Sequence, residues 1–269
     1  MTDGYGSALD EKRIRAALRV PDVRFELHGT LSSTNDRARA LALSGAPEWT
    51  VVAAQTQTAG RGRQGRSFFS PSGTGVYMSL LLRPESLLQP ERITVAAALA
   101  AAEAVEAVSG RQTQIKWVND VFLSGRKVAG ILTEGGASPD GGVWAAVGIG
   151  VNLLAPEDGF PDGLDAIAGA ALPAGSEAPR EALIAEILNR FDAWYARSDT
   201  ETLHAAYCTR DMLRGREVYI THNGGEMPAR AEGIGRDFGL LVRLPDGRAL
   251  SLTSGEARVR PVTAPEKEE

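Results

Sequence analysis

Three arginines and three glycines share seven positions in the arginine-glycine loop, residues 60–66 (GRGRQGR). Glycine lets the backbone approach a ligand closely, and arginine offers a fork of donors to phosphate or carboxylate. From these residues alone, three interpretations stay open: a solvated basic turn, an arginine-glycine segment that binds nucleic acid, or a loop that grips an anionic ligand. A GxxxxGK[ST] phosphate loop is excluded, because no Lys-Ser or Lys-Thr pair follows the glycines.

A second polar group comprises Lys116, Asn119 and Asp120 in the pentapeptide KWVND, and Lys127 at the start of KVAGIL. Polar side chains at the end of a strand cost free energy unless they find a partner. A salt-bridged hairpin would satisfy them, and so would a polar ligand. Lys127 follows a tight turn and has Gly130 nearby, so it could reach into a pocket whose floor is backbone. Asp120 could contact Mg²⁺ through a carboxylate oxygen.

The third group is Ser33, Thr34 and Asn35, at the predicted start of a helix. Serine and threonine are preferred N-cap residues, so capping alone would explain them. The same position also presents hydroxyls and free backbone N–H groups to a ligand.

The composition is that of a globular protein, since 43% of the 269 residues are hydrophobic and 23% are charged. No stretch approaches the ~18 consecutive apolar residues of a membrane span, and the N-terminus lacks an apolar signal core. We therefore expect a cytoplasmic protein without membrane contact. One cysteine and three scattered histidines predict neither an internal disulfide nor a zinc site. The net charge of −5 disfavours a general nucleic-acid binder.

Hydrophobic periodicity and turn residues predict the elements that must position these groups. Helices are expected at residues 9–19, 34–45, 91–109 and 180–197. Strands are expected at residues 50–54, 76–82, 114–123, 127–134 and 143–153, with a hairpin turn at 124–126. Prolines and glycines crowd residues 155–179, which predicts a loop.

After residue 213 the pattern changes to short strands separated by turn signals. They are expected at residues 217–222, 227–234, 240–244 and 248–252, which fits a small β-barrel. The sequence thus predicts an α+β fold with two domains, residues 1–213 and 214–269.

In this order, the motifs STN, QTQTAGRGRQGR, KWVND, KVAGILTE and GIGVN resemble the biotin protein ligase family, over about residues 33–152. The resemblance implies a mixed-sheet catalytic domain of the biotin/lipoate ligase type and a small C-terminal SH3-like β-barrel. Lipoate ligases and octanoyl transferases share the core fold but lack the arginine-glycine signature, so a lipoate or octanoate ligase or transferase is the alternative. Val118 stands where the family usually has proline, and Phe68 where a tryptophan is common. A β-branched valine suits a strand, and phenylalanine keeps an aromatic wall.

The resemblance also implies roles for the motif residues. Lys127, Arg63 and Asp120 would be the catalytic groups, and Asp120 would hold Mg²⁺. The biotin site would consist of Ser33, Thr34, Asn35, Gln57, Arg61, Gly62, Arg63 and Lys127. The ATP site would consist of Arg61, Arg63, Arg66, Lys116, Asn119 and Asn152.

The activity implied is the ATP-dependent attachment of biotin to a specific lysine of a biotin carboxyl carrier domain, through biotinyl-5′-AMP. Its partner would be the carrier domain of a biotin-dependent carboxylase, and the protein would be a monomer or a weak homodimer. Some family members carry an N-terminal winged-helix repressor domain. Only about 30 residues precede the STN motif here, so we expect no nucleic-acid binding. A pure binding module that uses the arginines for nucleic acid would instead show salt-dependent affinity and no pyrophosphate release.

Overall fold

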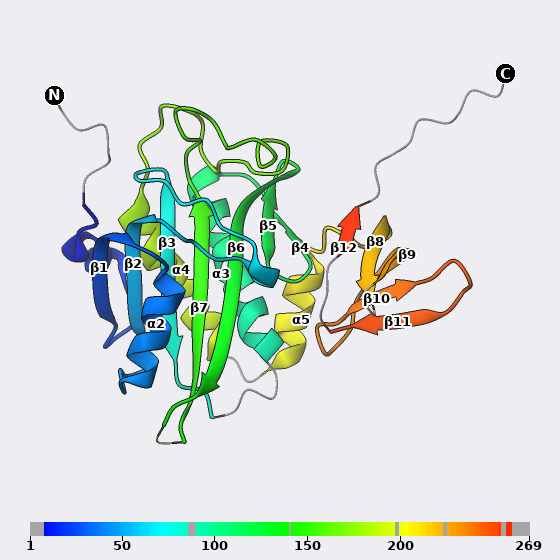
Figure 1. The fold of residues 1–269 in the computed structure, drawn as a ribbon, viewed down its shortest axis with the longest axis horizontal. Coiled ribbons are helices and arrows are strands. Elements are labelled where there is room, and N and C mark those ends of the chain that lie inside the picture. The colour runs from blue at the N-terminus through cyan, green and yellow to red at the C-terminus, as the bar shows by residue number, and fades with distance from the viewer. Residues whose placement is uncertain are drawn as a thin grey trace.

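A seven-stranded mixed sheet forms the larger part of the structure, a computed structural model that describes residues 8–85, 90–139, 141–196, 199–222, 225–253 and 257–259 (Figure 1). The strands run in the order β1-β2-β3-β7-β6-β5-β4. Only β1 and β2 are parallel; every other neighbouring pair in this sheet is antiparallel. The strands are β1 (Arg24–Leu31), β2 (Thr50–Gln57), β3 (Gly75–Leu82), β4 (Gln114–Lys116), β5 (Asp120–Leu123), β6 (Arg126–Ala137) and β7 (Val143–Asn152).

Helices cover the two faces of this sheet unequally. Successive strand residues point to opposite faces. Val52 packs with Ala38 of α2 (Thr34–Leu43), whereas its neighbour Val51 belongs to the core shared with the other helices. In Figure 1, α2 lies in front of β1–β3, and α3 and α4 lie behind the sheet. The helices behind are α1 (Glu11–Ala17), α3 (Pro90–Ser109) and α4 (Arg180–Tyr195). On this face α2 therefore covers β2, β3 and part of β7.

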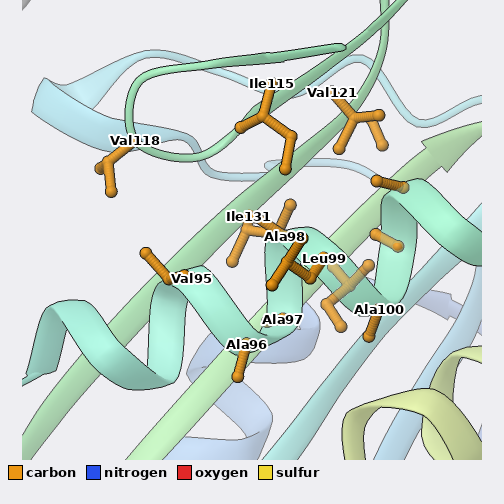
Figure 2. Packing of buried hydrophobic residues seen from close by; sticks show 14 of the residues in the cluster. Val95, Ala96, Ala97, Ala98, Leu99, Ala100, Ile115, Val118, Val121 and Ile131 are labelled. Atoms are coloured by element: carbon orange, nitrogen blue, oxygen red, sulfur yellow. The ribbon is translucent and has the colours of Figure 1, made fainter. Parts of the chain in front are cut away.

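The alanine-rich helix α3 is the centre of the main core. Alanine has the highest helix propensity, and its small side chain lets the helix approach the sheet closely. Figure 2 shows Val95, Ala98 and Leu99 of α3 beside Ile131 of β6, with Ile115 on the same side. All five side chains are fully or almost fully buried. This packing fixes the back of β6, whose other face carries the residues described below.

Helix α5 (Thr200–Cys208) leads into a second, five-stranded sheet, which is antiparallel throughout. Its order is β11-β10-β9-β8-β12, and it fits the small SH3-like domain predicted from the sequence. The predicted turn at residues 223–224 lies outside the described residues, and the boundary at residue 213 stays a prediction. The strands are β8 (Glu217–His222), β9 (Gly225–Ile234), β10 (Leu240–Arg243), β11 (Ala249–Leu252) and β12 (Ala257–Val259).

The predicted α+β class is confirmed, and one predicted strand is wrong. Residues 114–123 are not a single strand, because the chain turns at residues 117–119 and pairs β4 with β5. Val118 therefore lies in a turn, where β-propensity does not apply, and the Trp117–Val118 peptide bond is cis. The predicted loop at 155–179 holds no helix or strand.

Three elements had no counterpart in the sequence prediction: β1, α5 and β12. Strand β1 is an edge strand with no fully buried residue, so its hydrophobic pattern is weak. Helix α5 buries only Leu203 and Tyr207, too short a stripe to predict a helix. Strand β12 has three residues. Across the described parts of the chain, no helix combines the length and apolar character needed to cross a bilayer.

Candidate active site

A cavity of about 480 Å³ lies on the face of the large sheet that α2 covers only in part. Its floor is the backbone of β6 and β7, where Gly130 pairs with Gly150 and Leu132 pairs with Gly148. α2, the arginine-glycine loop and the β4–β5 turn supply the walls. The cavity thus gathers segments that lie far apart in the sequence, from Ser33 to Ala257.

Glycines make this floor possible, because a side chain there would collide with the walls. A Cβ atom at residue 148 would lie 2.4 Å from Oδ1 of Asn35, and one at residue 150 would lie 2.6 Å from the ring of Phe68. At residue 130 it would lie 3.2 Å from Nζ of Lys127. A side chain at residue 148 or 150 would force Asn35 or Phe68 to shift, and one at residue 130 would crowd Lys127.

One end of the cavity is neutral and polar. The backbone N–H of Thr34 donates to Oε1 of Gln57 at 2.9 Å, and the Thr34 hydroxyl also donates to it, at 3.1 Å. Oγ of Ser79 lies 2.8 Å from Oγ1 of Thr34 and 2.6 Å from Oδ1 of Asn35. Ser33 caps α2 by accepting from the N–H of Asp36. The capping interpretation is therefore confirmed for Ser33. Ser33, Thr34 and Asn35 also line the cavity, and their role in binding a ligand stays a prediction.

The arginine-glycine loop lies against the cavity and is anchored through two of its arginines. Arg61 donates to the carboxylates of Asp36 and Glu134, the second at 2.8 Å. The hydrogen bond that Arg61 donates to Asp36, together with the negative charges of both carboxylates, holds the pKa of Arg61 above its usual value. Arg63 donates to Oδ1 of Asn119 at 3.1 Å. Directly after Arg63, Gln64 takes a positive φ of 57°, a backbone conformation that non-glycine residues rarely adopt.

The opposite end of the cavity carries the charged residues of the KWVND and KVAGIL motifs. Nζ of Lys127 lies 2.7 Å from Oδ1 of Asp120, and both side chains are about a quarter exposed. Nδ2 of Asn119 donates to the carbonyl oxygen of Ile131 at 2.8 Å, which fixes the amide in the turn. The hairpin salt bridge exists, and both of its partners also face the cavity.

Two residues from outside the large sheet hold the turn that carries these residues. Nε1 of Trp117 donates to the carbonyl oxygen of Phe238 at 2.9 Å, and the Tyr207 hydroxyl donates to the carbonyl oxygen of Val118 at 3.1 Å. Tyr207 is fully buried, and burial raises the pKa of its hydroxyl well above the usual value. Ala257 of β12 is itself a lining residue. The small domain is therefore part of the site's construction.

Removing the Tyr207 hydroxyl tests this anchor. Tyr207→Phe should destabilise the protein by about 1 kcal/mol, because the Val118 carbonyl loses its partner in a buried setting. For a chain of this size that corresponds to a Tm lowered by roughly 2–4 °C in a thermal melt. Tyr219→Phe, which removes the hydroxyl of an exposed tyrosine, is the matched control. An equal Tm for the two variants would contradict the anchor.

The cavity collects every predicted site residue except one. Asn152 ends β7 and is not among the lining residues, so its assignment to ATP stays a prediction. Sequence reasoning gave no role to Ser79 or to Glu134, the last residue of the KVAGILTE motif, and both contact lining residues of the site. It also missed Leu164 and Ile167, two apolar residues in the long loop. The predicted residues that line the cavity are Ser33, Thr34, Asn35, Gln57, Arg61, Gly62, Arg63, Arg66, Lys116, Asn119, Asp120 and Lys127.

The lining residues fit a metal ion only if other groups supply most of its ligands. Within the described residues, no group of three or more His, Cys, Asp and Glu side chains could hold a metal ion. Asp120 is the one carboxylate residue among the described residues that line the cavity. Mg²⁺ that accompanies a nucleotide needs one or two protein carboxylates, since phosphates and water complete its shell. Asp120 fits that requirement, and a metal bound by protein ligands alone does not.

Comparisons with known proteins agree on one family. Residues 29–152 match the sequence model of the biotin/lipoate A/B protein ligase family. The chain is 42% identical over 191 residues to the bifunctional ligase/repressor BirA of Bacillus subtilis, covering 70% of this chain and 59% of that protein. It is 36% identical over 230 residues to the biotin–[acetyl-CoA-carboxylase] ligase of Paracoccus denitrificans, covering 80% of this chain and 92% of that protein.

The fold has solved counterparts as well. The structure superposes on the biotin protein ligase of Aquifex aeolicus in complex with biotin and ATP, with a TM-score of 0.76 and 26% sequence identity. The match covers 88% of this chain and 98% of the Aquifex chain, so it includes both sheets.

Proposed function

The chain belongs to the biotin protein ligase family, and we propose that it attaches biotin to one lysine of a biotin carboxyl carrier domain, using ATP and a biotinyl-5′-AMP intermediate. One observation carries this proposal. A single cavity joins a neutral polar end, built on the STN motif, to a charged end that holds Lys127, Arg63 and Asp120. The reaction needs both ends, one for the head of biotin and one for its carboxylate beside a phosphate.

The polar end suits the ureido ring of biotin, which has one carbonyl acceptor and two N–H donors. Ser33, Thr34, Asn35 and Gln57 offer hydroxyl and amide groups of both kinds. The glycine floor and the ring of Phe68 leave a slot for the apolar body of the ligand. From there the carboxylate tail would extend towards Lys127. Arg61 and Gly62 would cover the bound ligand from the loop side.

In the first step, a carboxylate oxygen of biotin forms a bond to the α-phosphorus of ATP. The bond from that phosphorus to the bridging oxygen breaks, and pyrophosphate leaves. Two anions must meet, so the chain has to neutralise charge and align the reactants. Lys127 and Arg63 supply cationic donors beside the cavity, and Lys116, Asn119 and Arg66 extend the polar surface towards the nucleotide.

Mg²⁺ would enter with the nucleotide, with Asp120 as the carboxylate that contacts it. When bound, the ion neutralises phosphate charge. In the structure, Lys127 forms an ion pair with Asp120. The arrival of the substrates would therefore exchange this ion pair for contacts from Lys127 to the biotin carboxylate and from Asp120 to the metal.

In the second step, the amine nitrogen of the carrier lysine attacks the carbonyl carbon of the mixed anhydride, and AMP leaves. The attacking amine must be neutral, although a free lysine has a pKa of about 10.4. Asp120 could accept the proton or orient the amine. The arginine-glycine loop would keep water away from the anhydride. Because the reaction consumes ATP, we also propose a cytoplasmic location; the monomeric or weakly dimeric state stays a prediction.

The direct test is mass spectrometry of a carrier domain after incubation with the protein, biotin and MgATP. The carrier should gain the mass of one biotin, minus water. A carrier whose target lysine is replaced by arginine should gain nothing, and neither should a reaction without ATP. An unmodified wild-type carrier would refute the proposal. In a parallel incubation with lipoate in place of biotin, a lipoylated carrier would assign the chain to the lipoate branch of the family.

A further inference from the structure

We infer that Glu134 is a positioning residue that couples the polar end of the cavity to the arginine-glycine loop. It lies on β6, and its two carboxylate oxygens accept from different partners. Oε2 accepts from Nδ2 of Asn35 at 2.9 Å, and Oε1 accepts from Nη2 of Arg61 at 2.8 Å. Glu134 does not line the cavity itself, so it acts through these two residues.

The first of these contacts orients the amide of Asn35. Nδ2 of Asn35 donates to Glu134 and, at 3.2 Å, to the carbonyl oxygen of Leu132. Its Oδ1 therefore faces the hydroxyl of Ser79, 2.6 Å away. Asn35 is only 4% exposed, and a buried amide with a missing partner is costly. Glu134 thus acts with the Leu132 carbonyl to fix the orientation of the Asn35 amide at this end of the cavity.

The second contact fixes one end of the loop. Arg61 has two carboxylate partners, Asp36 and Glu134, and its side chain is 40% exposed. An exposed ion pair such as the one with Asp36 contributes little by itself. Glu134 differs from Asp36 because its other oxygen is tied to the buried Asn35. The loop is held to the pocket floor through Glu134, and to the β4–β5 turn through Arg63 and Asn119.

A carboxylate is required because both partners are donors. In Glu134→Gln the amide keeps one acceptor oxygen and gains an NH₂ group, which would face either Asn35 or Arg61. One of the two contacts must then fail, and the other is weakened because the acceptor no longer carries a charge. The change is nearly isosteric, so it removes the coupling without creating a cavity.

Limited trypsin digestion of the full chain without ligand measures the loop directly. Fragments cut after Arg61, Arg63 or Arg66 should appear about tenfold faster from Glu134→Gln than from wild type, because a charged hydrogen bond that holds the loop is lost. The matched control is Glu232→Gln, which breaks a similarly exposed glutamate–arginine pair, with Arg243, in the small domain. It should leave loop cleavage unchanged. Glu134→Asp, which keeps the charge but cannot reach both partners, should fall between wild type and Glu134→Gln.

Steady-state kinetics with biotin measure the effect of Glu134 on the polar end of the cavity. This second test rests on the proposed function. The KM for biotin should rise about tenfold in Glu134→Gln, with kcat at saturating biotin within about twofold of wild type. In an Arg61→Gln background, Glu134→Gln should add less to loop cleavage than it does alone.

Loop cleavage at the wild-type rate in Glu134→Gln, or additive effects with Arg61→Gln, would overturn the inference. So would faster cleavage with an unchanged KM for biotin, because Glu134 would then serve the loop alone. If the wild-type protein shows no activity with biotin, the proposed function fails. The cleavage results still decide whether Glu134 anchors the loop.

Discussion

Lys127→Ala should lower the rate of adenylate formation by about 10²–10³-fold, because the biotin carboxylate loses its cationic partner beside the α-phosphate. Removing one such electrostatic contact costs on the order of 2.7–4 kcal/mol in the barrier. Pyrophosphate release with biotin and MgATP, without carrier, is the measurement. Lys12→Ala is the matched control, since it removes the same charge from an exposed position on α1.

The fold must be checked at the same time, because Lys127 also pairs with Asp120. A thermal melt shows how far loss of the ion pair destabilises the hairpin. If Lys127→Ala is folded and releases pyrophosphate within about threefold of wild type, Lys127 has only the structural role of a salt-bridge partner and its catalytic assignment is wrong.

Gly150→Ala should weaken biotin binding by roughly 5–150-fold. A Cβ atom at this position would lie 2.6 Å from the ring of Phe68, so the ring must move, and it forms a wall of the cavity. Overpacking of this kind typically costs about 1–3 kcal/mol, and each 1.4 kcal/mol is about a tenfold change in affinity. Isothermal titration with biotin measures the effect.

The same sheet provides a matched control. At Gly29 on β1, an added Cβ atom would have no atom of the described residues within 4 Å, and like Gly150 this glycine has no positive φ. Gly29→Ala makes the same chemical change away from the cavity and should bind biotin as wild type does. Equal affinities of the two variants for biotin would mean that the glycine floor is not a binding surface.

The sequence was most informative where several motifs occur together and in one order. Each motif alone could be explained without a ligand, and the structure brings their residues to one cavity. The alanine-rich helix and the buried strands carried strong periodic patterns, so the α+β class could be predicted. Strand β1 and helix α5 bury too few residues to produce such a pattern.

Other features depend on contacts between residues far apart in the chain, which no local pattern records. In the sequence, Glu134 is simply a polar residue of a predicted strand. Its partners Asn35 and Arg61 are known only from the fold. The turn at residues 117–119 interrupts a run that reads as one strand, and it is held by Tyr207 and Phe238 from outside the large sheet. The sequence placed every first-step residue in the larger domain. The structure shows that the smaller domain supports the turn and contributes Ala257 to the cavity wall.

Pyrophosphate release in the absence of any carrier tests the central claim most directly, because it isolates adenylate formation in this cavity. The protein is mixed with MgATP and either biotin, lipoate or no acid, and pyrophosphate is followed through the first turnover. We expect a burst of about one equivalent of pyrophosphate per chain with biotin. With lipoate, we expect no pyrophosphate release above the acid-free background. Equal bursts with biotin and lipoate, or no burst with biotin, would contradict the central claim.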